Sequence, residues 1–297
     1  MFFFGVFHDM IGKKENESLY RRRKFGGGYM ERLIMLGSGA ACSMRCYNSC
    51  FALQDKDEYL LVDGGGGNGI LRQLAAADIP AAKIHNIYLT HEDTDRMFGV
   101  IWVIRVIAAA MRREEYDGDL HIYCHSDLIG TLRSVAGTVL SKKSRWLFDH
   151  RILFIPVYDN DTRRIMDPSL TFFDLYSPYE KQFGFSMDLG GGENFVFAGD
   201  EALHPENYSY ADHCSWLMHE AFCLYSQQEI YRPYESGHVT VKEACQTAEE
   251  LDAQNLILFN TEDENLKKRK ALFAAEGRLY YHGSIYVPDD LDRIEFY

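Results

Sequence analysis

Four short apolar segments of the chain each end in a cluster of polar side chains, and a fifth cluster comes directly before an expected helix. This repetition constrains the fold more than any other feature. The clusters are His91-Glu92-Asp93-Thr94-Asp95-Arg96, Gly199-Asp200-Glu201, His219-Glu220, Gly237-His238 and Asn260-Thr261-Glu262-Asp263. One such junction is weak evidence, because loops that follow strands are usually polar. Several in one chain are typical of the rim of an active site in a protein of mixed strands and helices.

The order of expected elements predicts the fold class. Strand-length apolar runs alternate with helical patterns in both halves of the chain. Strands are expected at 31–37, 49–53, 58–63, 84–90, 120–124, 152–157, 170–175, 183–189, 194–198, 215–219 and 255–260, and helices at 68–77, 98–113, 126–140, 205–211, 240–251 and 264–275. Ser126 is predicted to cap its helix. With no linker between the halves, residues 30–297 are predicted to form one α/β (α+β) domain, with two packed sheets between layers of helices.

Charge and cysteine content restrict the partners and the compartment. The formal net charge is −13, from 31 Lys and Arg against 44 Asp and Glu, so a nucleic-acid backbone is repelled and nucleic acid is not an expected partner. The seven cysteines are odd in number, which disfavours a secreted disulfide framework. No apolar segment is long enough to cross a membrane. We therefore expect a cytoplasmic protein without a membrane partner, and a homodimer stays open.

Residues 1–29 differ from the rest of the chain. They contain the basic run Arg21-Arg22-Arg23-Lys24 and the glycine run Gly26-Gly27-Gly28, just before Met30. We expect this segment to be a flexible extension of the domain. Alternatively, the segment is absent from the native protein, which then starts at Met30.

Further motifs in the same order resemble the metallo-β-lactamase superfamily, and within it the RNase Z-like hydrolases. Leu36-Gly37-Ser38-Gly39 is similar to the opening strand and turn of that family, and Asp63-Gly64-Gly65-Gly66 to its glycine-rich turn. His91 to Gly99 stands at the family's Thr-His-x-His-x-Asp-His-x-x-Gly motif. Asp200 stands at the metal-bridging Asp. His219-Glu220-Ala221 and His238-Val239-Thr240 are similar to the His-Glu-Ala and His-Ser-Thr motifs. The resemblance implies an αββα sandwich and metal-assisted hydrolysis.

The sequence departs from the family at the metal ligands. Of five expected histidines, only His91 is present. Asp93 and Arg96 replace two in the first motif, and Tyr176 and Asn260 stand at the other two positions. An Arg side chain carries a permanent positive charge and has no free lone pair for a metal. The resemblance therefore implies a degenerate centre.

Two ways of neutralising this pocket stay open. His91, Asp93, Asp95 and Asp200 could hold one divalent metal, and this oxygen-rich set suits Mn, Fe or Mg better than Zn. Alternatively, no metal is bound and Arg96 is a surrogate cation that pairs with Asp95 or Asp200.

The resemblance also implies catalytic roles beyond holding a metal. His238, oriented by Glu220, would act as general acid on a leaving group, and Asp95 would help to activate water. One hypothesis is a binding or regulatory module with a degenerate centre. The other is a mononuclear metal-dependent hydrolase of a phosphodiester or small ester. Both imply a small anionic or ester ligand.

Overall fold

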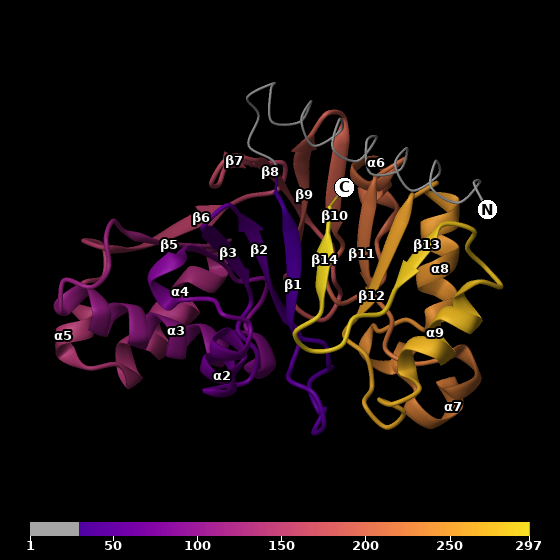
Figure 1. Cartoon of the computed structure of the whole chain (residues 1–297), viewed down its shortest axis with the longest axis horizontal. Coiled ribbons are helices and arrows are strands. Elements are labelled where there is room, and N and C mark those ends of the chain that lie inside the picture. Colours follow the sequence, from indigo (N-terminus) through magenta and orange to yellow (C-terminus); the bar gives the residue numbers. More distant parts are fainter. Residues whose placement is uncertain (1–29, 297) are drawn as a thin grey trace, which may run out of the picture.

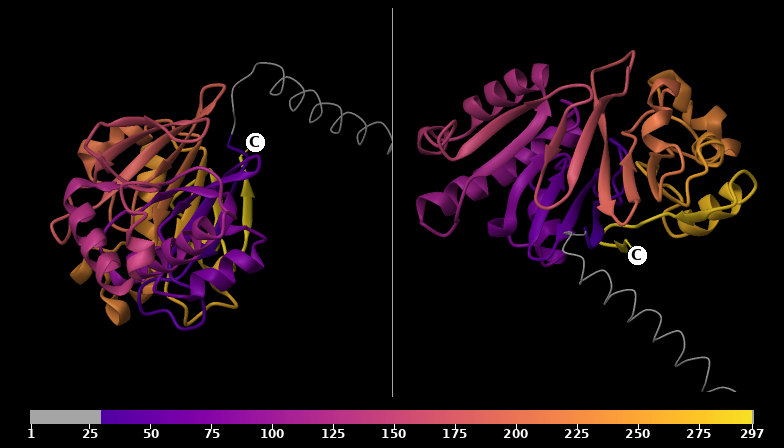
Figure 2. Two further views of the ribbon diagram at one scale, coloured as in Figure 1. Left: turned by 90° about the vertical axis from the view of Figure 1, so that its left-hand side faces the viewer. Right: turned by 90° about the horizontal axis from the view of Figure 1, so that it is seen from above.

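The structure, a computed structural model, describes residues 30–296. The expectation for residues 1–29 lies outside these residues. Two sheets face each other, and helices cover the outer face of each one (Figure 1, Figure 2). This arrangement confirms the predicted αββα sandwich.

Each sheet has seven strands and combines antiparallel with parallel pairs. In the first sheet the spatial order is β14 (Arg293–Glu295), β1 (Arg32–Gly37), β2 (Cys50–Asp55), β3 (Glu58–Val62), β4 (Ile84–Tyr88), β5 (Leu120–His125) and β6 (Ile152–Val157). In the second it is β13 (Ser284–Tyr286), β12 (Asn255–Phe259), β11 (Trp216–Glu220), β10 (Glu193–Phe197), β9 (Phe183–Gly190), β8 (Ser169–Asp174) and β7 (Thr162–Arg164). The last strand of the chain therefore completes the sheet made by the first half.

The helices divide between the two sheets. The first sheet is covered by α2 (Gly69–Ala76), α3 (Thr94–Arg112), α4 (Ser126–Val139) and α5 (Lys142–Arg145), and the second by α6 (Tyr208–Ala211), α7 (Gln228–Tyr231), α8 (Val241–Glu250) and α9 (Arg269–Gly277) (Figure 1). Single 3₁₀ turns occur at Ala81–Lys83, Pro205–Asn207, Tyr225–Gln227 and Pro233–Ser236. None of the helices formed by residues 30–296 is long and apolar enough to cross a membrane.

Strand alternation accounts for the layered core. Successive side chains of a strand point to opposite faces of its sheet. In β1, Leu33 and Met35 pack into the apolar cluster between the sheets, whereas Ile34 and Leu36 pack under the helices. The cluster between the sheets is rich in aromatic rings, among them Phe51, whose ring centroid lies 5.3 Å from that of Phe197. Both faces of the central strands are buried, which explains their nearly continuous apolar sequences.

Some boundaries differ from the sequence-based expectations. Helix α3 begins at Thr94, not at residue 98, and α9 begins at Arg269, not at residue 264. The predicted cap at Ser126 is wrong: His125 is the N-cap of α4, and its ring accepts a hydrogen bond from the Leu128 amide. Strands β7, β13 and β14 were not expected, because each has only three residues.

A close backbone approach fixes the start of α3 against the glycine-rich turn after β3. A Cβ atom added to Gly99 would lie 1.7 Å from the carbonyl oxygen of Gly64. The amide of Gly99 donates to the Gly65 carbonyl at 2.8 Å, and the amide of Gly64 donates to the Arg96 carbonyl at 2.9 Å. The start of α3 is thereby held against the turn after β3.

Candidate active site

The expected polar clusters meet where the two sheets face each other. The turn after β4 provides His91 and Asp93, the first turn of α3 provides Asp95 and Arg96, and the turn after β10 provides Asp200. Glu220 ends β11 and Asn260 follows β12. Parallel strands present their carboxyl ends at one edge of a sheet, so the contributions from β10, β11 and β12 gather at one place.

The guanidinium group of Arg96 lies at the centre of this cluster. Its Nη1 donates to Asp95 Oδ2 at 2.8 Å, and its Nη2 donates to Asp200 Oδ2 at 2.6 Å and to Asn260 Oδ1 at 2.9 Å. Its Nε lies 3.8 Å from Asp63 Oδ2. All of these side chains are buried. Three carboxylates are thus neutralised in part by one cation that belongs to the chain itself.

The titration behaviour of the pair reflects this mutual stabilisation. Burial alone would lower the pKa of Arg96, but Asp200, Asp95 and Asp63 together raise it above its ordinary value. Burial alone would raise the pKa of Asp200, but His91 and Arg96 hold it well below its usual range. Both groups are therefore charged at neutral pH.

A buried relay orients His91. The Thr90 hydroxyl lies 2.9 Å from Asp63 Oδ2 and 2.8 Å from His91 Nδ1. Burial raises the pKa of Asp63 to about 6, so this carboxylate is ionised at neutral pH and accepts the hydroxyl proton. The hydroxyl oxygen then accepts from Nδ1–H of His91. This assignment leaves His91 Nε2 as the nitrogen available to the pocket.

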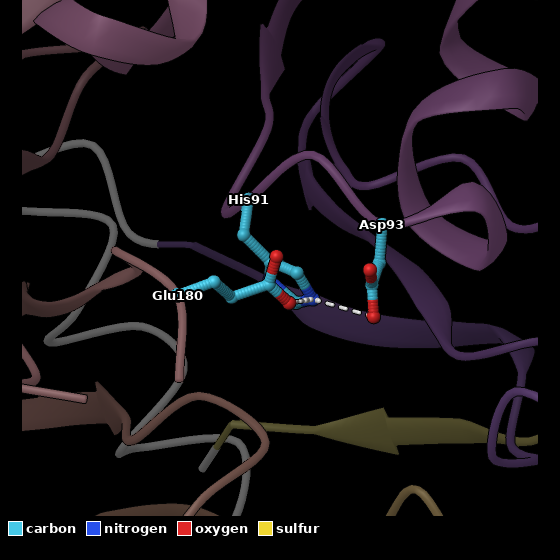
Figure 3. Close-up of side chains that lie close together, drawn as sticks. All are labelled: His91, Asp93 and Glu180. Carbon is cyan, nitrogen blue, oxygen red and sulfur yellow. Dashed lines mark ion pairs between the residues drawn. The ribbon is translucent and has the colours of Figure 1, made fainter. Parts of the chain in front are cut away.

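Three carboxylates surround His91 Nε2. The nearest oxygens of Glu180 and Asp200 lie 3.6 Å away, and that of Asp93 lies 4.0 Å away. Figure 3 shows Glu180 and Asp93 on either side of the imidazole. Ligand atoms of His91, Asp93 and Glu180 all lie within 4.8 Å of one another, close enough to hold one metal ion. An imidazole beside carboxylates offers the ligand types that a divalent metal ion accepts.

Glu180 is not among the site residues predicted from the sequence. It lies between β8 and β9, in the same connection as Tyr176, and it belongs to no motif. Burial, opposed by His91 and reinforced by Asp93, raises its pKa to about 7. The only signal in the sequence is an acidic residue in the loop where the family places a ligand.

The second predicted pair, His238 with Glu220, is assembled as expected. His238 Nδ1 lies 2.9 Å from Glu220 Oε2, and the other carboxylate oxygen of Glu220 accepts from the Val239 amide at 2.7 Å. The ring of Phe222 stacks on His238 at 5.0 Å between centroids. Burial opposes protonation of His238, but Glu220 and Asp200 outweigh it and raise the pKa to about 9. His238 is therefore cationic at neutral pH, with Nε2 left to donate.

Of the other residues in the family-like motifs, Asn260 lies in the cluster around Arg96, whereas Tyr176 and His219 lie outside it. Asn260 joins the cluster, since its amide group also donates to Glu220 Oε2 at 3.3 Å. Tyr176 is half exposed, and its ring packs on His204. His219 is buried: its Nδ1 donates to the Glu220 carbonyl, and its Nε2 accepts from the Leu203 amide. All seven cysteines are free thiols.

Comparison with known proteins gives the family. Residues 31–272 match the family of the Anti-Pycsar protein Apyc1. The chain belongs to this Apyc1 family. Among curated relatives, Ribonuclease Z of Thermococcus onnurineus is 26% identical, over 82% of this chain and 90% of that protein. The resemblance to RNase Z-like proteins is thereby confirmed.

Solved structures confirm the metallo-β-lactamase fold of this Apyc1 family member. The metallo-β-lactamase fold protein YhfI of Bacillus subtilis has a TM-score of 0.74 at 17% identity, covering 90% of this chain and all of YhfI. PqqB of Methylobacterium extorquens, solved with bound Zn²⁺, has a TM-score of 0.65 at 13% identity, covering 89% of this chain and all of PqqB. At these identities the similarity establishes the fold alone.

Proposed function

We propose that this chain is a hydrolase-fold protein with a degenerate metal centre, in which Arg96 replaces metal and the pocket binds a small anionic or ester ligand without dinuclear catalysis. The observation that carries the proposal is the arrangement of Arg96 between Asp95, Asp200 and Asn260. The oxygens that a second metal would need already accept hydrogen bonds from a permanent cation. Such a cation also repels any divalent ion placed beside it.

A ligand-binding role rests on His238. Its imidazolium ring is oriented by Glu220 and stacked on Phe222, and it is partly exposed. Its Nε2–H can donate a charge-assisted hydrogen bond to a phosphate or carboxylate oxygen. Binding without turnover would suit a binding or regulatory module.

A second function is favoured by one observation, the convergence of His91, Asp93 and Glu180. One imidazole and two carboxylates suit a divalent ion such as Mn²⁺, Fe²⁺ or Mg²⁺. An ion there would supply Lewis-acid polarisation of a phosphoryl oxygen. The chain would contribute His238 as proton donor to the leaving group, with Glu220 holding its ring. This alternative is a mononuclear hydrolase of a phosphodiester or small ester.

Metal content and one probe compound separate the two functions. Protein purified without added metal is examined by elemental analysis, then titrated calorimetrically with Mn²⁺ and with bis(p-nitrophenyl) phosphate. The binding module predicts less than about a tenth of an equivalent of any transition metal. It also predicts binding of the phosphodiester without release of p-nitrophenol, and weaker binding in His238→Gln. One tightly bound equivalent of metal together with p-nitrophenol release would establish the hydrolase instead.

A restoration variant tests the role of Arg96 directly. Asp93→His, Arg96→His and Asn260→His together return three of the four substituted positions to histidine. The variant is expected to bind more Zn²⁺ than the natural chain. Equal Zn²⁺ uptake by the two proteins would contradict the assignment of Arg96 as the replacement for metal.

A further inference from the structure

A hollow away from the candidate active site lies beside the short helix α5, which is at the left of Figure 1. Its volume is about 750 Å³, within the range of small-molecule sites. Its polar and aromatic lining consists of Arg112, Lys142, Lys143, Trp146, His150 and Arg151. None of these residues belongs to the candidate active site.

The charge of this hollow is opposite to that of the protein. The chain as a whole carries −13, yet the lining holds four permanent cations and no carboxylate. Among residues 30–296, Lys142 and Lys143 form no ion pair, and Arg112 donates to the Ser144 hydroxyl at 3.0 Å. Arg151 alone has a carboxylate partner, Asp119 at 3.2 Å. A positive concavity on an acidic protein concentrates small anions.

An aromatic platform lies beside these cations. The side chain of Trp146 is 70% exposed, unusually open for an indole. It stacks on His150 with an interplanar angle of 12° and a centroid distance of 5.3 Å. His150 Nδ1 is 2.9 Å from the Phe148 carbonyl, which can only accept, so Nδ1 carries the proton and the ring is held in place. The buried side chains of Met111 and Leu147 supply an apolar floor.

From this combination we infer a second ligand site, which takes a small anion with a planar ring, namely a nucleoside monophosphate. Lys142, Lys143 and Arg112 would contact the phosphate group, and the base would stack on Trp146. Stacking on an exposed indole suits any base, because every base has a π face. The limited volume favours a mononucleotide over a strand of nucleic acid, which needs an extended basic groove.

Calorimetric titration with adenosine 5′-monophosphate tests the site. We expect binding that weakens about tenfold in the double variant Lys142→Ala, Lys143→Ala, because two phosphate contacts are lost. The matched control is Lys267→Ala, Lys268→Ala, which removes the same charge from an exposed pair next to α9 and should leave the affinity unchanged. The tenfold loss caused by Lys142→Ala, Lys143→Ala should also be seen in a His238→Gln background, where any binding at the candidate active site is weakened, and this separates the two sites.

The contribution of Trp146 to nucleotide binding is tested separately. Trp146→Leu is expected to weaken adenosine 5′-monophosphate binding about tenfold while leaving the response to inorganic phosphate as it was. Quenching of indole fluorescence by the nucleotide should disappear in the same variant. The inference is overturned by no binding at millimolar nucleotide, by equal weakening in the Lys267 and Lys268 control, or by binding of a thymidine oligonucleotide alone.

Discussion

Arg96 Nη2 and Asp200 Oδ2 lie 2.6 Å apart, although the two residues are separated by 104 positions in the chain. The pair joins the first turn of α3, which follows β4 of the first sheet, to the turn after β10 in the second. Both side chains are buried, so the interaction is shielded from water. It therefore contributes to holding the two halves together as well as to the charge of the pocket.

Removing the buried cation should destabilise the protein strongly. Arg96→Met leaves Asp95, Asp200 and Asp63 without their neutralising partner, and we expect a loss of about 3 to 5 kcal/mol in the free energy of unfolding. Urea denaturation measures this change. The matched control is Arg133→Met. It breaks a solvent-exposed ion pair with Asp149 that has two hydrogen bonds, and it should lower the free energy of unfolding by at most about 1 kcal/mol. Similar losses in the two variants would contradict a buried ion pair.

The close approach at Gly99 predicts a large steric effect. In Gly99→Ala the new methyl group would overlap the Gly64 carbonyl, so the start of α3 must shift, at a cost of about 3 kcal/mol or more. Gly130→Ala is the control, since Gly130 is exposed in α4 and a Cβ there meets no atom within 4 Å. It should gain about 0.5 to 1 kcal/mol from helix propensity. Thermal denaturation of both variants gives the comparison.

The burial of His219 predicts that the stability of the protein depends on pH. Burial lowers its pKa to about 4 from an ordinary 6.5, so between these values the unfolded chain binds more protons than the folded one. The free energy of unfolding should therefore fall as the pH is lowered from 6.5 to 4, by about 3 kcal/mol from this residue. Urea denaturation across this window should show a shallower slope in His219→Gln. An unchanged slope would show that His219 does not remain neutral when folded.

The number of metal ions that the pocket binds can be measured, and variants of two neighbouring carboxylates test which one is a ligand. Because Arg96 occupies the other oxygens, we expect uptake of at most one equivalent of Mn²⁺ by calorimetry. Asp93→Asn should lower any such affinity at least about tenfold, since Asp93 belongs to the triad with His91 and Glu180. Glu92→Gln, at the exposed neighbouring position, should leave it unchanged. Two equivalents of bound Mn²⁺ would overturn the assignment of Arg96.

The sequence by itself determined the fold and much of the pocket's membership. The order of apolar runs is a local pattern set by strand periodicity, and His91, Asp200, Glu220 and His238 were singled out because their short motifs resemble those of the metallo-β-lactamase superfamily. These features depend on residues that are close together in the chain. They could be read in order without knowledge of how the two sheets pack.

Only the tertiary structure decided which side chains each of these carboxylates meets. The sequence left a shared metal and Arg96 open, because a side chain with five donors can reach partners on several turns. The packed sheets bring Asp200 and Asn260 to the guanidinium, and a loop with no motif brings Glu180 to His91. Such contacts depend on distances across the interface between the sheets, and no local pattern in the chain encodes those distances.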